Sequence, residues 1–276
     1  MIRPRKRFGQ HWLTSPKILT RIVAAAQLQP NDCVLEIGPG QGILTEQLLG
    51  RVESVIAAEI DRDLCRVLQE KFAEQKSFYL IEGDFLALDL PDDMANRLSA
   101  GAIALPNKAV ANIPYYITGP ILAKLLGTIS SPPVLSLETI VLLVQKEVAD
   151  RICAQPGSKT FGAMSVRLQY LADCHYICDV PPGAFYPPPK VTSAVVRLRP
   201  RAYPFPATDL THLDQVVKAG FASRRKMLRN NLQPWVERDR LLALLDALEL
   251  KPQVRAEDLS VQQWVGLSNK ILEDGA

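Results

Sequence analysis

The sequence has no apolar run that approaches the ~20 residues needed for a membrane-spanning helix, although 47% of its 276 residues are hydrophobic. It does not begin with the charged, apolar and small-residue stretches of a secretory signal, so we expect none. Internal repeats and low-complexity tracts are also absent. With 22% charged residues, the composition predicts an ordinary globular protein that is long enough for two domains.

Cysteine is scarce and occurs in an odd number, which argues against a disulfide framework and for a reducing compartment such as the cytoplasm. The five cysteines are Cys33, Cys65, Cys153, Cys174 and Cys178. Cys174 and Cys178 flank His175. Together these residues could form a metal site, and the alternative is that the cysteines are buried or half-buried thiols. The spacing matches none of the usual zinc patterns, and the local sequence predicts a strand. We therefore expect no metal.

Acidic residues are missing from the first 31 positions, although the net charge is only +3. The basic residues in this stretch are Arg3, Arg5, Lys6, Arg7, Lys17 and Arg21. A second acid-free cluster contains Arg224, Arg225, Lys226 and Arg229. One such run alone is typical of solvated surface, but two of them favour a polyanionic partner. An Arg-rich, acid-poor beginning is also typical of an organelle transit peptide.

Strand and helix patterns alternate through the first two thirds of the chain. The predicted strands are 32–37, 52–58, 78–81, 108–112, 139–144, 175–180 and 193–198, and the predicted helices are 16–28, 43–49, 62–75 and 146–153. Alternation of this kind predicts a parallel sheet with helices on both faces, here ending in a hairpin-like pair of strands. Residues 209–272 have helical spacing, and 200–206 carry three prolines. We therefore predict an α/β domain over 1–200 and a small helical domain over 207–276.

Polar residues and glycines follow the first three predicted strands. Gly38, Gly40 and Gly42 come after the first strand, where glycine allows a tight turn and close approach of a ligand. Glu59 ends the second strand, 21 residues beyond Gly38, and a carboxylate at this distance accepts hydrogen bonds from ribose hydroxyls. Asp84 ends the third strand and could accept hydrogen bonds from an adenine amine. The pattern predicts a site for an adenosine-containing cofactor.

The glycine-rich turn also bears on which cofactor is bound. It has an acidic residue, Glu36, two positions before Gly38, and it lacks the third glycine of the dinucleotide-binding pattern. It resembles motif I of the class I S-adenosylmethionine methyltransferases. NAD is the alternative cofactor.

The segment Asn112-Ile113-Pro114-Tyr115 ends the fourth predicted strand, beside the predicted cofactor site. The amino nitrogen of adenine is a poor nucleophile because its lone pair is delocalised into the ring. The Asn112 side-chain oxygen and the Pro114 carbonyl could accept both amino hydrogens and favour a pyramidal nitrogen with a free lone pair. Tyr115 could stack on a base turned out of its helix or loop. The segment predicts methyl transfer to an adenine amino group.

With these motifs the chain resembles the KsgA family, also called RsmA, of small-subunit ribosomal RNA adenine dimethyltransferases. The matching segments run from 5–13 through 34–45, 83–85, 112–118, 145–152, 156–162 and 187–193 to 221–232. The resemblance implies a Rossmann-like class I methyltransferase with a seven-stranded, mostly parallel sheet, an antiparallel last strand and a small all-helical C-terminal domain. It also implies S-adenosylmethionine as cofactor and transfer of two methyls to each of two adjacent adenines near the 3′ end of 16S rRNA.

The resemblance extends the site to the beginning of the chain. It implies that His11 and Leu13 join the cofactor site, within a flexible basic segment over 1–15. His11 departs from the asparagine that is common in the family, and Trp12 from the usual phenylalanine. A backbone contact at position 11 would survive that change, whereas a side-chain amide contact would not. Phe185 is either a second stacking partner for the target base or a hydrophobic anchor.

Two other functions share these motifs. One is methylation of large-subunit rRNA by the resistance methyltransferases, and the other is a non-catalytic role in ribosome assembly or RNA binding. The loop 156–162, the segment 221–232 and the complete acceptor motif favour a catalytic small-subunit enzyme. Because the family motif begins within ten residues of Met1, we expect no removable targeting segment. We expect a monomer that binds 16S rRNA, with Arg224, Arg225, Lys226 and Arg229 as RNA contacts.

Overall fold

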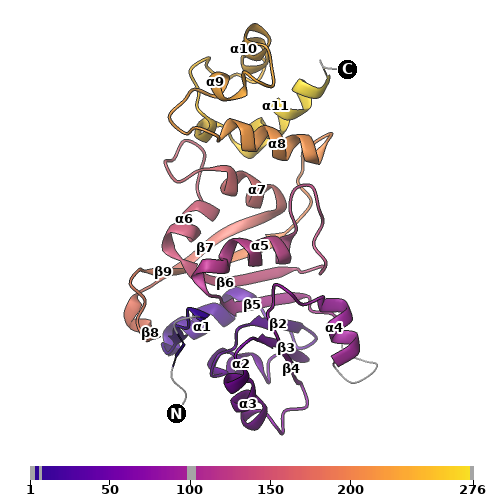
Figure 1. The fold of residues 1–276 in the computed structure, drawn as a ribbon, viewed down its shortest axis with the longest axis vertical. Coiled ribbons are helices and arrows are strands. Elements are labelled where there is room, and N and C mark those ends of the chain that lie inside the picture. The colour runs from indigo at the N-terminus through magenta and orange to yellow at the C-terminus, as the bar shows by residue number, and fades with distance from the viewer. Residues whose placement is uncertain (1–3, 6–7, 98–103, 274–276) are drawn as a thin grey trace. The chain divides into compact units, whose positions relative to one another are not determined.

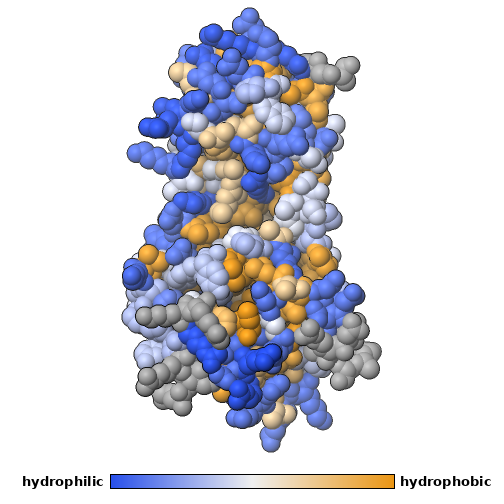
Figure 2. All heavy atoms as spheres, in the orientation of Figure 1, coloured by the Kyte–Doolittle hydropathy of each residue, from blue (hydrophilic) through white to orange (hydrophobic). Residues whose placement is uncertain are grey.

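The structure, a computed structural model, describes residues 4–5, 8–97 and 104–273. The chain divides into two compact units (Figure 1). The α/β unit comprises Met1–Gly127, Pro133–Ala149 and His175–Pro200, and the helical unit comprises Thr128–Pro132, Asp150–Cys174 and Arg201–Ala276. Within the described ranges, no helix has the length and apolar character needed to cross a membrane. Hydrophilic side chains cover most of the visible surface of each unit, with smaller hydrophobic patches between them (Figure 2).

A seven-stranded sheet with the order β4-β3-β2-β5-β6-β9-β7 forms the centre of the fold. Its strands are β2 (Cys33–Ile37), β3 (Ser54–Glu59), β4 (Phe78–Glu82), β5 (Lys108–Asn112), β6 (Thr139–Gln145), β7 (Ala172–Val180) and β9 (Ser193–Pro200). The first five strands in chain order pair in parallel, and β9 is antiparallel to β6. The predicted sheet, with its antiparallel last strand, is confirmed. Strand order reverses between β2 and β5, and ligands of open α/β sheets bind beside such a reversal.

Helices alternate with these strands along the chain. They are α1 (Pro16–Ala26), α2 (Ile43–Leu48), α3 (Arg62–Lys71), α4 (Leu90–Arg97), α5 (Thr118–Leu126) and α6 (Lys146–Ile152). Helix α1 begins at a proline, whose fixed φ suits a first helical position, and ends at Gln27 in the left-handed conformation. Its buried Ile18 and Ile22 share a core with Val34 and Val110 of the strands. Because strands buried on both faces are continuously apolar, their positions were predictable from sequence.

The helical unit contains α7 (Ala163–Leu171), α8 (Leu210–Gly220), α9 (Leu228–Leu232), α10 (Arg238–Asp246) and α11 (Val261–Glu273). Its core surrounds Trp264, which is fully buried. Gly220 is required by this packing, because a Cβ there would lie 2.3 Å from the Trp264 ring. This unit is larger than the helical domain expected over 207–276.

The difference arises from helix α7. This helix contacts α8 and α11, and Phe161 and Val166 belong to the same buried core as Trp264. Helix α7 was not predicted from sequence, because its apolar side chains are spread around the helix instead of following one face. Residues 150–174 therefore group with the helical unit although they precede the proline-rich segment 200–206.

A second small sheet orders part of the segment that was expected to be flexible. Strand β1 (Trp12–Leu13) pairs antiparallel with β8 (Phe185–Tyr186), and the Thr14 amide donates to the Ala184 carbonyl at 2.8 Å. Residues 12–14 thus have defined backbone partners. Of the basic residues in this segment, Arg3, Lys6 and Arg7 lie outside the described residues.

Candidate active site

A cavity of about 170 Å³ opens at the carboxyl ends of β2, β3, β4 and β5. It is lined by most of the residues predicted for the cofactor and acceptor sites. These are His11, Gly38, Gly40, Glu59, Asp84, Asn112, Pro114 and Tyr115. Leu13 is buried and lines a smaller hollow that shares Gly38, Gly40 and Asn112 with the cavity wall. The structure thus brings together side chains from separate segments of the chain.

The three glycines after β2 have different surroundings. All have positive φ, which side chains other than glycine rarely adopt. A Cβ at Gly38 would meet nothing within 4 Å, whereas one at Gly40 would lie 3.1 Å from the Trp12 ring, and one at Gly42 2.7 Å from Phe72. Only Gly38 therefore keeps open space beside the cavity, and the other two make room for aromatic side chains.

Two buried carboxyl groups lie beside the glycine turn. Glu59 accepts hydrogen bonds from the amides of Gly40 at 3.1 Å and Asp61 at 2.9 Å, and burial raises its pKa. Glu36 accepts a hydrogen bond from the Thr45 hydroxyl at 2.7 Å, and burial raises its pKa to about 8. The two backbone donors fix the Glu59 carboxylate in the cavity wall, and its remaining lone pairs could accept hydrogen bonds from ribose hydroxyls.

The turn after β4 also lines the cavity. Asp84 is exposed and accepts a hydrogen bond from the Leu86 amide at 3.0 Å. The Lys124 ammonium, on α5, donates to the carbonyls of Phe85 at 2.7 Å and Leu86 at 3.2 Å, and also to that of Leu88. Sequence reasoning missed Lys124, because a single lysine on an amphipathic helix looks like any surface charge.

The acceptor motif has an oriented amide. The Asn112 Nδ2 donates to the His11 backbone carbonyl at 2.9 Å. Since only the nitrogen end of the amide can donate, this contact turns the side-chain oxygen away from His11. The Pro114 carbonyl accepts a long hydrogen bond from the Ile117 amide at 3.3 Å, and its second lone pair stays available. Asn112 and Pro114, the two residues whose oxygens were predicted to accept the amino hydrogens, both line the cavity.

Tyr115 has a partner for its hydroxyl and another for its ring. Its hydroxyl lies 2.6 Å from the Ser193 hydroxyl, and its ring is 6.0 Å from the nearly parallel ring of His11. The His11 Nδ1 in turn lies 2.7 Å from the Pro187 carbonyl, so this nitrogen carries the proton and donates. Phe185 is buried in the core of the α/β unit and outside the cavity lining, the environment of a hydrophobic anchor.

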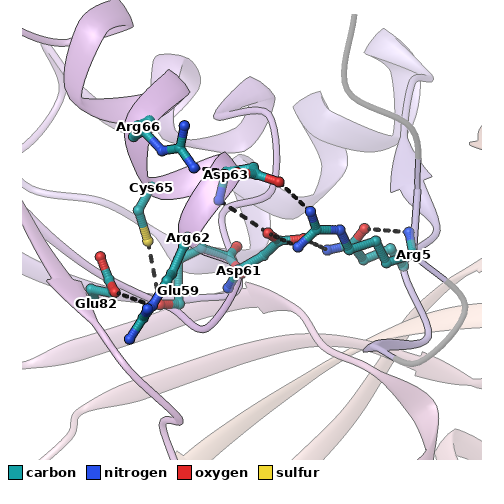
Figure 3. Close-up of polar contacts among 9 residues, drawn as sticks. Arg5, Glu59, Asp61, Arg62, Asp63, Cys65, Arg66 and Glu82 are labelled. Atoms are coloured by element: carbon teal, nitrogen blue, oxygen red, sulfur yellow. Dashed lines mark hydrogen bonds and ion pairs between the residues drawn. The ribbon is translucent and has the colours of Figure 1, made fainter.

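Arg5 anchors the N-terminal segment next to Glu59 (Figure 3). Its guanidinium binds Asp61 at 2.7 Å and also contacts Asp63, while Gln10 Nε2 donates to Asp61 at 3.2 Å. Asp61 is buried and also caps the N-terminus of α3. Arg5 is therefore engaged within the chain, in contrast to the expectation that the basic residues of this segment face a polyanion.

The basic cluster of the helical unit is joined by a second segment. Arg224, Arg225 and Lys226 are exposed, and Arg229 is half-buried. The Arg224 guanidinium donates to the Lys159 carbonyl, so the loop 156–160 lies against this cluster. Lys159 is also exposed. We call Lys159, Arg224, Arg225 and Lys226 the basic patch. Lys159 is 65 residues from Arg224 in the chain, and no sequence pattern predicted that they meet.

A family model described as ribosomal RNA adenine dimethylase matches residues 1–273. The chain belongs to this family. It is 60% identical over 271 residues to the ribosomal RNA small subunit methyltransferase A of Trichormus variabilis, covering 98% of this chain and 99% of that protein. Family membership confirms the methyltransferase assignment over the NAD-dependent alternative.

Two solved structures of methyltransferases have the same fold. A dimethyladenosine transferase from Plasmodium falciparum has a TM-score of 0.79 and 25% identity, covering 96% of this chain and 98% of that one. The 23S rRNA methyltransferase ErmE has a TM-score of 0.74 and 28% identity, covering 94% of this chain and 99% of that one. The Rossmann-like fold of the α/β unit is thus shared with methyltransferases that are named for different substrates.

Proposed function

We propose that this dimethylase transfers methyl groups from S-adenosylmethionine to the N6 amino groups of two adjacent adenines near the 3′ end of 16S rRNA. The observation that carries the proposal is the orientation of Asn112. Its amide nitrogen is bound to the His11 carbonyl at 2.9 Å, so its oxygen is the end that can accept an amino hydrogen.

The cavity wall suits S-adenosylmethionine. The open space at Gly38 lets a ligand approach the backbone, Glu59 presents a fixed carboxylate to a ribose, and Asp84 has a second oxygen for an adenine amine. When bound, the cofactor supplies an electrophilic methyl group on a sulfonium. Leu13 was also predicted for this site. It lines the smaller hollow and would contribute to the site by packing there.

The residues of the chain would prepare the nucleophile. The Asn112 side-chain oxygen and the Pro114 carbonyl bind the two amino hydrogens, which frees the nitrogen lone pair. Tyr115, fixed by Ser193, gives the base a rigid wall. In the transfer the amino nitrogen would gain the methyl group as the methyl–sulfur bond breaks and its electron pair stays on sulfur. The resulting cationic nitrogen would then lose a proton to water. No strong base is required, so alignment is the main contribution of the protein.

The small subunit is the proposed substrate because the relative at 60% identity is named for it. ErmE, named for 23S rRNA, is 28% identical. In the helical unit, Arg224, Arg225, Lys226 and Arg229 would bind RNA phosphates, with Lys159 beside them. Action as a monomer in the cytoplasm stays a prediction.

Labelled S-adenosylmethionine and purified ribosomal subunits that lack the modification test this proposal. We expect label only in small-subunit RNA, on two adjacent adenines, with up to four methyls for each particle. Label only in large-subunit RNA would establish the resistance-type activity instead. Binding to small subunits without any transfer would establish a non-catalytic assembly role.

A further inference from the structure

Tyr116 directly follows the acceptor motif and is the most exposed large hydrophobic side chain among the described residues, at 65%. Its aromatic ring gains little from packing within the free protein. It nevertheless contributes to the lining of the cavity that contains Asn112 and Pro114. An exposed aromatic ring at the edge of a binding cavity is the kind of surface on which an unstacked base can lie.

The backbone around Tyr116 holds the ring in a defined place. Tyr115–Ile117 form a single 3₁₀ turn. The ring edge also lies against Gly9, where a Cβ would be 3.2 Å from the Tyr116 Cε1 atom. Gly9 has a φ of +60°, so the N-terminal segment passes close to the ring without a side chain between them. The ring is therefore supported by backbone and still open to solvent.

Tyr115 and Tyr116 have different environments although they are neighbours in the sequence. The Tyr115 hydroxyl is bound to Ser193 and its ring lies beside His11, whereas Tyr116 is mostly exposed to solvent. Because consecutive Cα atoms are only ~3.8 Å apart, both tyrosines line the same cavity. One tyrosine can thus face the target base while the other meets the next base along the strand.

We propose that Tyr116 is a stacking platform for the nucleotide adjacent to the target adenine. The proposal rests on the proposed function, in which that neighbour is the second adenine of the pair. Because every base has a π-face, the platform would accept either adenine while the other occupies the cavity. Tyr116 would position the RNA strand and take no part in the chemical step.

A cycle that combines a protein variant with an RNA variant tests this contact. Small-subunit particles are assembled on RNA in which one adenine of the pair is replaced by an abasic nucleotide, and methylation of the remaining adenine is measured as kcat/KM. We expect the abasic neighbour to lower kcat/KM of the natural enzyme by roughly 5- to 150-fold, the range for loss of one stacked base. Tyr116→Ala on intact RNA should cause a similar loss, and the combination should cause no further loss.

Two further variants separate stacking from other effects. Tyr116→Phe keeps the ring and should retain activity within about twofold, a small change beside the loss expected for one stacked base. Phe205→Ala removes another exposed aromatic ring, 55% exposed and outside the cavity lining, and should behave like the natural enzyme. Binding of the cofactor alone, measured by calorimetry, should be the same for Tyr116→Ala and the natural enzyme.

The outcomes distinguish this proposal from the proposed function. The stacking platform would be overturned if the losses of kcat/KM caused by Tyr116→Ala and by the abasic nucleotide multiplied fully when the two changes were combined. It would also be overturned if Tyr116→Ala were as active as the natural enzyme. In either case the proposed function would stand. Failure of the natural enzyme to methylate intact particles would overturn both.

Discussion

The Asn112 amide nitrogen donates to the backbone carbonyl of His11 at 2.9 Å. This bond links the end of β5 to a segment that lies 101 residues earlier in the chain. It fixes which end of the amide faces His11, and it needs only the backbone of residue 11. The uncommon histidine at this position is therefore compatible with an oriented acceptor site.

Replacement of Asn112 should abolish catalysis without abolishing RNA binding. Asn112→Ala removes the side-chain oxygen, and Asn112→Asp places a carboxylate against the His11 carbonyl, to which it cannot donate. We expect both variants to lose at least about 100-fold in single-turnover rate, the scale of losing one preorganised hydrogen-bond partner. The affinity for small subunits, measured by filter binding, should stay within about twofold, since contacts with RNA phosphates dominate it. Methylation by Asn112→Ala at the natural rate would contradict the acceptor assignment.

Replacement by alanine should affect cofactor binding at Gly38 and stability at Gly42. Both have positive φ, so each variant carries a similar backbone strain of about 1–2 kcal/mol. The methyl group of Gly38→Ala would enter the open space beside the cavity and should raise the Kd for S-adenosylmethionine by about tenfold or more. The methyl group of Gly42→Ala would meet Phe72 and should lower the free energy of unfolding by a further 1–3 kcal/mol or so.

Calorimetric titration and urea unfolding of the two glycine variants separate these effects. Equal changes in cofactor affinity for both variants would show that Gly38 is only a turn residue.

The contact of Arg5 with Asp61 and Asp63 should contribute to retention of the cofactor. Arg5→Gln removes one anchor of the N-terminal segment, which covers one side of the cavity through residues 8–12. We expect about a fivefold faster release of S-adenosylmethionine, which corresponds to about 1 kcal/mol for a partly exposed ion pair. Arg66→Gln is the matched control, because Arg66 also binds Asp63, at 2.6 Å, but belongs to α3. Stopped-flow dissociation that is equally fast in both variants would exclude such a role for Arg5.

Glu36 should make stability depend on pH. Burial raises its pKa from 4.5 to about 8, so the folded protein binds more protons than the unfolded chain between these values. Stability contributed by the protonated form is therefore lost as pH rises from about 4.5 to 8. Glu36→Gln keeps an oxygen that can accept the Thr45 hydrogen bond and should flatten this decline.

Urea unfolding of both proteins at about pH 6 and about pH 9, on either side of the raised pKa, measures the effect of Glu36. Burial raises the pKa of Glu59 as well, so some decline should persist in the variant. Identical pH dependence in the two proteins would show that Glu36 ionises normally.

The basic patch should determine the salt dependence of RNA binding. Replacement of Arg224, Arg225 and Lys226 by glutamine should weaken binding and reduce the slope of log K against log salt by up to about 0.7–0.9 for each phosphate that is no longer neutralised. Lys159→Gln should reduce the slope by the amount expected for one phosphate, because the loop that carries Lys159 is bound to Arg224. Arg238→Gln, an exposed change on α10, serves as the control. A slope unchanged by the triple replacement would mean that these cations are only solvated surface.

Local patterns in the sequence were sufficient to predict the sheet and the positions of its polar strand ends. The run Cys33–Ile37 is buried on both faces and apolar except for Glu36, and glycines follow it because the turn requires positive φ. Glu59, Asp84 and Asn112 each lie at or just beyond the end of a parallel strand, and such ends meet at one edge of a sheet. Short-range spacing therefore located most of the cavity wall.

The tertiary structure decided which residues beyond these motifs join the site and how they are oriented. The pairing of β1 with β8, the contact of Arg5 with Asp61 and the approach of Lys159 to Arg224 all connect residues far apart in the chain. No periodicity encodes such contacts, because they depend on how separate elements pack. The sequence by itself predicted a methyl-transfer site at the carboxyl ends of the strands. Only the folded chain decided that the Asn112 amide nitrogen binds the His11 carbonyl and that Tyr116 is exposed while lining the cavity.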